Sequence, residues 1–128
     1  MGEWTSEELS KIEFAEELTI ASRRGNGTLR MPATIWVVRH GNHLYVRSVN
    51  GAQGAWFRGT QTQQLGQIRA GGVTKDVKFV SIDSADQVGD EVDAAYRAKY
   101  RRYPASIVNS VLTPEARAAT LELVPNDQ

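Results

Sequence analysis

The feature that most constrains the fold of this sequence is a hairpin pattern between residues 35 and 48. Residues 35–38 (Ile-Trp-Val-Val) are β-branched or aromatic and strongly favour a strand. The pair Gly41-Asn42 predicts a tight turn, and residues 44–48 return as a second strand. Side chains alternate along this strand, with Leu44, Val46 and Ser48 on one face and His43, Tyr45 and Arg47 on the other. Strands joined by so short a turn favour antiparallel pairing.

The rest of the chain repeats this pattern and adds helices. A second hairpin is predicted around Gly71-Gly72, and Thr5-Ser-Glu-Glu8 forms a capping box for a first helix, with Leu9, Ile12 and Phe14 on its buried side. Further strands are predicted at residues 16–22, 28–39, 73–82 and 120–124, a loop or helical turn at 60–65, and helices at 86–102, 105–112 and from 113 onward. This order predicts a mainly β, α+β fold, in which one domain over residues 1–128 forms a small antiparallel barrel with helices at its openings.

Composition excludes several classes of function. The 128 residues carry 15 Lys+Arg and 15 Asp+Glu, so no overall basic field attracts nucleic acid. The absence of cysteine removes disulfides, thiolate nucleophiles and Cys-based metal sites, and fits a cytoplasmic protein. The acidic N-terminus is not a signal peptide, and no apolar run approaches the roughly 20 residues that span a bilayer.

A group of polar residues follows the second strand of the first hairpin and suggests a site for an anion. Arg47 offers a forked cationic donor, Ser48 a hydroxyl, and the loop with Asn50 and Gly51 offers backbone N–H groups to a phosphate. Trp56 and Arg58 suit a flat aromatic ligand with a phosphate tail. The alternative interpretation is a solvated strand end, followed by a core tryptophan and a surface arginine.

Three other groups of residues are better explained without a function. His40 and His43 flank the tight turn and lack the further ligands that a metal site needs. Val88, Val92, Tyr96, Tyr100 and Tyr103 recur at helical spacing and predict core or dimer packing. Arg97, Lys99, Arg101 and Arg102 form the outer face of the same helix, and a solvated face explains them better than nucleic-acid binding. No nucleophile–base pair, P-loop or dinucleotide fingerprint is present in the sequence.

Motifs spread along most of the chain resemble a small uncharacterised bacterial family within the FMN-binding split-barrel superfamily. That superfamily includes pyridoxamine-phosphate-oxidase-like and deazaflavin-dependent nitroreductase-like proteins. The motifs are Trp36-Val-Val-Arg39, Leu44-Tyr-Val-Arg-Ser48, Gly51, Trp56-Phe-Arg58, Ile68-Arg-Ala-Gly-Gly72, Ala94-Ala-Tyr-Arg-Ala-Lys-Tyr100 and Ala119-Thr-Leu-Glu-Leu-Val-Pro125. The resemblance implies an antiparallel split β-barrel that forms a homodimer.

The resemblance also implies a cofactor site, namely FMN or a deazaflavin in a cleft between two subunits. Nitroreductase-like relatives hold the phosphate and ring with a Ser-Lys-Gly-Gly loop and a Pro-x-Trp segment, which Ser48, Gly51 and Trp56 match. Arg30 and Thr34 lie on the strand that borders this site in the superfamily. Val49 stands at the position of the lysine, and Gly54-Ala55 replaces the proline. The expectation is therefore a flavin- or deazaflavin-binding protein, an oxidoreductase of unknown substrate. The alternative is a non-catalytic small-ligand-binding or structural dimer without the cofactor.

Overall fold

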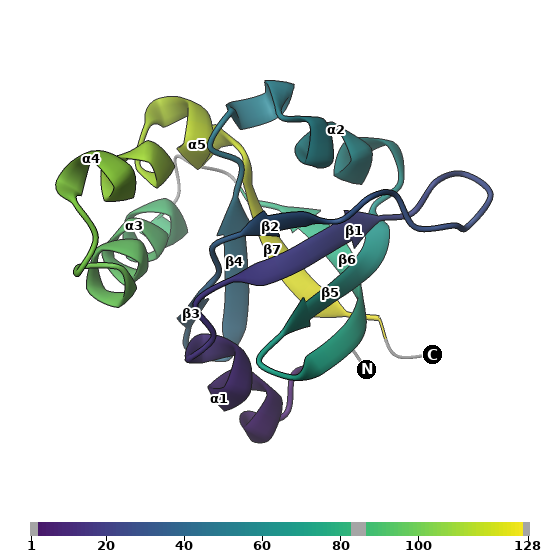
Figure 1. Cartoon of the computed structure of the whole chain (residues 1–128), viewed down its shortest axis with the longest axis horizontal. Coiled ribbons are helices and arrows are strands. Elements are labelled where there is room, and N and C mark those ends of the chain that lie inside the picture. Colours follow the sequence, from purple (N-terminus) through teal and green to yellow (C-terminus); the bar gives the residue numbers. More distant parts are fainter. Residues whose placement is uncertain (1–2, 83–86, 127–128) are drawn as a thin grey trace.

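The structure is a computed structural model that describes residues 3–82 and 87–126. Within these residues, one seven-stranded antiparallel sheet has the strand order β2-β1-β5-β6-β7-β4-β3 (Figure 1). The strands are β1 (Leu18–Ser22), β2 (Ala33–Ile35), β3 (Val38–His40), β4 (His43–Arg47), β5 (Leu65–Ala70), β6 (Val73–Ser81) and β7 (Thr120–Pro125). The helices are α1 (Ser6–Glu13), α2 (Ala55–Thr62), α3 (Gln87–Lys99), α4 (Ala105–Val108) and α5 (Pro114–Ala118), with 3-10 turns η1 (Gly51–Gln53) and η2 (Asn109–Val111).

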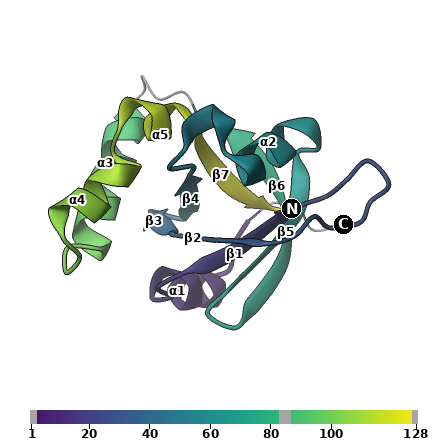
Figure 2. The ribbon, with the colours of Figure 1, turned by 45° about the horizontal axis from the view of Figure 1, so that its top comes forward.

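The sheet curls because its two edge strands are consecutive in the chain. β2 pairs only with β1, and β3 pairs only with β4, among the described strands. Trp36 and Val37 alone connect the two edges, so Ile35 and Val38 are three residue steps apart and separated by at most about 11 Å. The opposite edges of the sheet are therefore held close to each other without pairing, as the positions of β2 and β3 in Figure 2 show.

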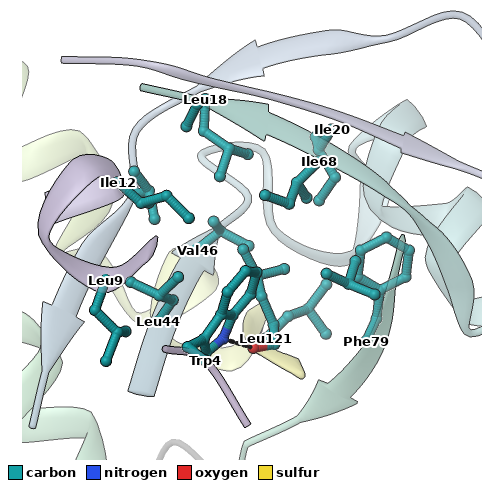
Figure 3. Packing of buried hydrophobic residues seen from close by; sticks show 14 of the residues in the cluster. Trp4, Leu9, Ile12, Leu18, Ile20, Leu44, Val46, Ile68, Phe79 and Leu121 are labelled. Atoms are coloured by element: carbon teal, nitrogen blue, oxygen red, sulfur yellow. Dashed lines mark hydrogen bonds between the residues drawn. The ribbon is translucent and has the colours of Figure 1, made fainter. Parts of the chain in front are cut away.

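The inner face of the curled sheet encloses the larger hydrophobic cluster. Leu18, Ile20 and Leu44 are buried there, and α1 closes one opening by inserting Leu9 and Ile12 (Figure 3). The indole Nε1 of Trp4 donates to the carbonyl of Leu123 at 2.9 Å, which ties the N-terminal segment to β7. The other buried members of this cluster are Val37, Val46, Phe57, Ile68, Ala70, Val77, Phe79, Ala119, Leu121 and Leu123.

A second hydrophobic cluster lies between the outer face of the sheet and α3. Val38 and Tyr45 contribute from β3 and β4, while α3 contributes the stripe that includes Val92 and Tyr96. Trp36 stacks on Tyr100, with ring centroids 3.8 Å apart and an interplanar angle of 4°. The two faces predicted for β4 therefore serve two separate cores, one inside the barrel and one beneath α3.

Local sequence signals are confirmed. Thr5 and Glu8 form the complete capping box of α1. Gly41 has φ +61° in the first hairpin, and Gly71 and Gly72 have φ +57° and +85° in the second, the left-handed region that glycine adopts most easily. Thr113 caps α5, with Pro114 in its first turn. The mainly β, antiparallel α+β class predicted from the sequence is also confirmed.

Several predicted boundaries are wrong. Phe14 ends α1 but is 84% exposed, because the chain leaves the core after Ile12. The extended segment predicted at residues 28–39 is two short strands separated by Trp36 and Val37. The helical turn or loop predicted at residues 60–65 is partly confirmed, since α2 runs through Thr62, but its end is wrong because β5 begins at Leu65. The predicted helix cap at residues 84–86 lies outside the described residues.

Candidate functional site

The mouth of the barrel contains a hollow of about 340 Å³ beside the gap between the sheet edges. One wall is β2 with its link to β3, and the opposite wall is the C-terminal end of β4. The N-terminal turn of α2 and the α4–η2 segment complete it. The lining residues are Ala33, Thr34, Ile35, Trp36, Arg47, Ser48, Val49, Asn50, Trp56, Ile107, Ser110 and Val111.

A second hollow of about 510 Å³ adjoins the first, because Ala33, Asn50 and Trp56 line both. It runs along the N-terminus of α2 and the segment before β2. Its other lining residues are Ile20, Ser22, Arg30, Met31, Pro32, Gly54 and Ala55. Together the two adjoining hollows form one depression, whose two parts share Ala33, Asn50 and Trp56.

Arg47 is part of the wall, but its guanidinium points into the protein and is only 2% exposed. It pairs with Asp93 on α3, and its Nε donates to Thr120 Oγ1 at 2.9 Å. Its remaining hydrogen bonds go to the carbonyls of Val111 at 2.9 Å and Gly89 at 3.0 Å. The solvated strand end offered as the alternative for Arg47 is therefore wrong, and so is its predicted role as a forked donor to a phosphate, because its guanidinium nitrogens already bind protein groups. The positive charge is neutralised behind the wall by Asp93.

Asp93 serves two arginines at once. Besides Arg47, it accepts from Nη1 of Arg117 at 2.6 Å, and Arg117 also reaches the exposed Asp90 at 3.1 Å. These contacts join β4, α3 and α5, so they fix the position of η2 on one side of the first hollow. Arg47 thus determines the shape of the wall through the Val111 carbonyl.

Ser48 has the opposite character, because its hydroxyl is buried and has no partner. The residue is 1% exposed, and its Oγ accepts or donates no hydrogen bond among the described residues. Gly54 lies directly over it, and a Cβ at Gly54 would come 2.4 Å from that oxygen. A buried hydroxyl without a partner costs free energy. Ser48 is therefore a candidate to bind a group in the first hollow, which it lines.

The hydroxyl of Ser48 lies close to the N-terminus of α2, and the first backbone amides of this helix have no side-chain cap. Gly54 occupies the N-cap position and provides no side-chain cap for the first amides. Free N–H groups and the helix dipole make such a terminus attractive to an anion. Arg30 lines the hollow beside it, and its Nε is buried without a hydrogen-bond partner in the described part of the chain.

Six of the eight predicted site residues line the depression. Arg47, Ser48, Asn50, Trp56 and Thr34 line the first hollow, and Arg30 lines the second. Arg58 is exposed on α2 and lines neither. Gly51 also lines neither. It has φ +65°, and a Cβ there would lie 3.1 Å from Glu115 Cβ and 3.2 Å from its carbonyl oxygen.

The sequence interpretation missed the contribution of the helical segment after α3. Ile107, Ser110 and Val111 line the first hollow, although they follow Trp56 by more than fifty positions. Trp36 also lines it, while stacked on Tyr100. A tryptophan next to a strand edge was the available signal for Trp36. No local pattern marks the other three.

The remaining candidate groups have structural partners. His40 Nε2 lies 3.0 Å from Glu91, and His43 Nδ1 lies 2.7 Å from Glu122, so each has a nearby carboxylate that the sequence did not reveal. In the described residues, no group of three His, Cys, Asp or Glu side chains suits a metal ion. No helix within 3–82 and 87–126 is long and apolar enough to cross a bilayer.

The predicted basic face of α3 is not continuous. Lys99 Nζ donates to the carbonyl of Val37 at 2.7 Å and lies partly buried. Arg102 pairs with Glu16. Among the four, only Arg97 and Arg101 remain as exposed cations without a carboxylate partner in the described residues, which is too little for a nucleic-acid surface.

A model of a protein family described as uncharacterised and conserved in bacteria (DUF2255) matches residues 8–123. The chain belongs to this family. The DUF2255 match includes every residue of both hollows. A comparison with curated protein sequences gave no significant match.

Solved structures show the fold to which this DUF2255 chain belongs. The heme storage protein HutZ from Vibrio cholerae is 11% identical, with TM-score 0.68 over 93% of this chain and 87% of that chain. An F420 reductase is 15% identical, with TM-score 0.53 over 92% of each chain. A FAD-binding protein from Mesorhizobium loti is 14% identical, with TM-score 0.56 over 97% and 91%. The chain has the split-barrel fold that its sequence motifs implied.

The residues of the depression suit a phosphorylated, planar cofactor. The unpartnered Ser48 hydroxyl, the uncapped terminus of α2 and Arg30 offer donors to a phosphate. The indole rings of Trp36 and Trp56 offer flat apolar surface in the same depression. A side chain at Gly54 would collide with the Ser48 hydroxyl, because a Cβ there would lie 2.4 Å from its Oγ. Val49, half exposed at the edge of the first hollow, provides no charge there.

Proposed function

We propose that the chain binds a flavin-type cofactor, FMN or a deazaflavin, in the two adjoining hollows and acts as an oxidoreductase. One observation carries this proposal, namely the buried Ser48 hydroxyl that has no partner and lies at the uncapped N-terminus of α2. The split-barrel fold supports it, since similar structures include an F420 reductase and a FAD-binding protein.

The residues would divide the work between the phosphate and the ring. Ser48, Asn50 and the first amides of α2 would hold the phosphate, with Arg30 as the nearby cation. Trp36 and Trp56 would cover the ring and exclude water. The cofactor, when bound, supplies the electron- or hydride-transfer chemistry, because the chain offers no nucleophile–base pair of its own.

The first test is cofactor binding by the purified protein. Its visible spectrum and its Tm are recorded with FMN, FAD and a deazaflavin. A ligand at a hundred times its Kd adds about 2.7 kcal/mol, which corresponds to a rise in Tm of about 10 °C for a chain of this length. If the protein is colourless and none of the three changes its Tm, the proposal is wrong.

The second test separates a binding role of Ser48 from a structural one. Ser48→Ala removes an unpartnered buried hydroxyl, so the free protein keeps its Tm or gains slightly. The same change removes a hydrogen bond to a charged phosphate and weakens cofactor binding by about tenfold to a hundredfold. Ser81→Ala on the exposed end of β6 is the matched control, and Arg58→Gln and Arg101→Ala should also leave binding unchanged. Equal losses for Ser48→Ala and Ser81→Ala would mean that the site is misplaced.

A non-catalytic small-ligand-binding or structural dimer is the second candidate. Two observations favour it: Val49 stands where nitroreductase-like relatives carry lysine, and the charge of Arg47 is already neutralised by Asp93. This candidate predicts no response to any flavin but retains the dimer. We also propose that the protein is a homodimer in the cytoplasm. Sedimentation of the purified protein tests the dimer.

A further inference from the structure

A third hollow, of about 360 Å³, lies away from the proposed cofactor site and shares no lining residue with its two hollows. It lies between the C-terminal end of α1, strand β3 and α3. Its apolar lining consists of the buried Val38, the half-buried Ala95, and the exposed Ala98 and Phe14. Glu13 and Arg39 also line it. The amine-bearing side chain of Lys99 completes it. The hollow therefore combines an amine with open apolar space.

The amine of Lys99 makes one hydrogen bond and no ion pair among the described residues. Its Nζ donates to the carbonyl of Val37 at 2.7 Å and lies 5.2 Å from the centre of the Tyr100 ring. Neither contact neutralises a cation. The ammonium group is thus partly withdrawn from water and has no carboxylate within hydrogen-bonding distance among the described residues.

The charged groups around Lys99 do not compensate for its burial. Burial lowers the pKa of Lys99 to about 8, against the opposing influence of Glu13 and Glu16. Each of those carboxylates is already paired with an arginine. Arg39, which also lines the hollow, binds Glu13 at 2.9 Å, and Arg102 binds Glu16. A substantial fraction of the amine is therefore neutral, and nucleophilic, at mildly alkaline pH.

We propose that Lys99 is an acylation site, which takes short acyl groups from acyl thioesters and holds the acyl chain in the hollow formed with Val38, Ala95 and Ala98. In this reaction the neutral amine attacks the thioester carbonyl carbon and forms the C–N bond. The C–S bond breaks, the thiolate leaves, and the nitrogen releases one proton to solvent. The products are an amide on Lys99 and a free thiol, so no further reactant is needed.

The product suits this environment better than the charged lysine. The amide keeps one N–H, which can continue to donate to the Val37 carbonyl. The partly buried charge is gone, and the acyl chain covers the apolar lining of the hollow. The fold thus favours the modified side chain, whereas acylation of an exposed lysine brings no comparable gain.

The chain provides its own internal standards, because its four lysines are Lys11, Lys75, Lys78 and Lys99. Lys11 and Lys75 pair with Glu7 and Glu8, at 3.2 Å and 3.1 Å. Lys78 is exposed on β6. At pH 8 about half of an amine with a pKa near 8 is neutral, against about 0.4% of an ordinary lysine. A less basic amine is also a weaker nucleophile, and the Brønsted slope known for thiols gives a loss of about tenfold for Lys99. The larger neutral fraction outweighs this loss, so at pH 8 Lys99 should react about tenfold faster than an ordinary lysine.

The experiment treats the full chain with S-butyryl-N-acetylcysteamine and follows each lysine by peptide mass mapping between pH 7 and 10. Lys99 should react about tenfold faster than Lys78 at pH 8. Its rate should level off just above pH 8. If Lys78 reacts as fast as Lys99 at pH 8, the proposal is overturned.

A pair of variants on α3 tests the hollow itself. Ala98→Trp fills the hollow, whereas Ala94→Trp adds the same bulk at an exposed position outside it. Ala98→Trp should slow butyrylation of Lys99 at least severalfold and leave Lys78 unchanged. Ala94→Trp should change neither. Equal rates of Lys99 butyrylation in both variants would show that the acyl chain does not bind in the hollow. If one variant folds poorly, the comparison of Lys99 with Lys78 in the wild-type chain still tests the proposal.

Discussion

The buried pair of Arg47 and Asp93 gives the strongest stability prediction. We expect Asp93→Asn to destabilise the protein severely, because it keeps the shape of the side chain and removes only its charge. The Arg47 side chain is fully buried and that of Asp93 is 9% exposed, so the arginine would be left as an uncompensated buried cation. Breaking such a pair from one side typically costs about 3–5 kcal/mol.

The expected change in Tm follows from the length of the chain. An unfolding entropy of about 2.1 cal/mol/K per residue gives about 0.27 kcal/mol/K for 128 residues. A loss of about 3–5 kcal/mol therefore lowers Tm by about 11–18 °C. Urea unfolding monitored by tryptophan fluorescence, at one fixed protein concentration, measures the same loss directly.

Asp90→Asn is the matched control. Asp90, like Asp93, binds Arg117, at 3.1 Å, but the Asp90 side chain is 78% exposed. Exposed ion pairs contribute about 0–1 kcal/mol, so this variant should lower Tm by no more than about 4 °C. The double variant Arg47→Met with Asp93→Leu removes both buried charges and should recover part of the stability. The recovery stays incomplete because Arg117 still loses one of its carboxylates and the Val111 and Gly89 carbonyls lose their donor. If Asp93→Asn costs no more than Asp90→Asn, the buried pair is not what fixes α3 to the sheet.

Three further perturbations have defined outcomes. Gly66→Ala should lower the free energy of unfolding by about 1–3 kcal/mol, because its Cβ would lie 2.2 Å from the Ala21 carbonyl oxygen. Gly25→Ala is the control: it has open space around it and should change stability by no more than about 0.5 kcal/mol in urea unfolding. Thr5→Ala should cost about 1 kcal/mol by removing the α1 capping box, measured by thermal unfolding. The free energy of unfolding should rise with pH from about 8 towards 10, because Lys99 has released its proton in the folded state but still binds it in the unfolded state. The Tm, measured across this pH range, should show the rise in the wild type and not in Lys99→Met.

The same pH titration should turn downward above about pH 10. Burial raises the pKa of Tyr96 and of Tyr100, so both phenols keep their protons in the folded state after the unfolded chain has lost them. The unfolded state then binds fewer protons, and stability falls as pH increases. Lys99→Met should retain this decline, which separates the tyrosines from the lysine.

The sequence predicted the features that depend on local geometry. Gly41 marks a hairpin because the left-handed turn needs a residue that tolerates positive φ. The stripe of Val92, Tyr96 and Tyr100 marks α3, since side chains four positions apart share one face of a helix. These signals lie within a few residues of one another, so they do not depend on how the chain folds over longer distances.

Features that depend on distant partners were not predictable. Arg47 and Asp93 are 46 positions apart, and a charged residue at a strand end gives no sign of whether it faces water or a carboxylate. Helix α2 contains Gly59 and two threonines, which favour a helix weakly. It forms where Phe57 is buried in the barrel core. Only the tertiary structure brings Ser110 and Trp36 into one hollow.

The position of Arg47 changes how an anion would be attracted to the barrel mouth. Arg47 and Arg117 are balanced locally by Asp93 and Asp90, so this network adds no net charge to the first hollow. Attraction must then come from Arg30 and from the partial positive charge at the N-terminus of α2. A phosphate held mainly by hydroxyl and amide donors in a partly buried site is screened only weakly by salt. Cofactor affinity should therefore change little between low and physiological ionic strength, whereas capture by several exposed arginines would weaken steeply.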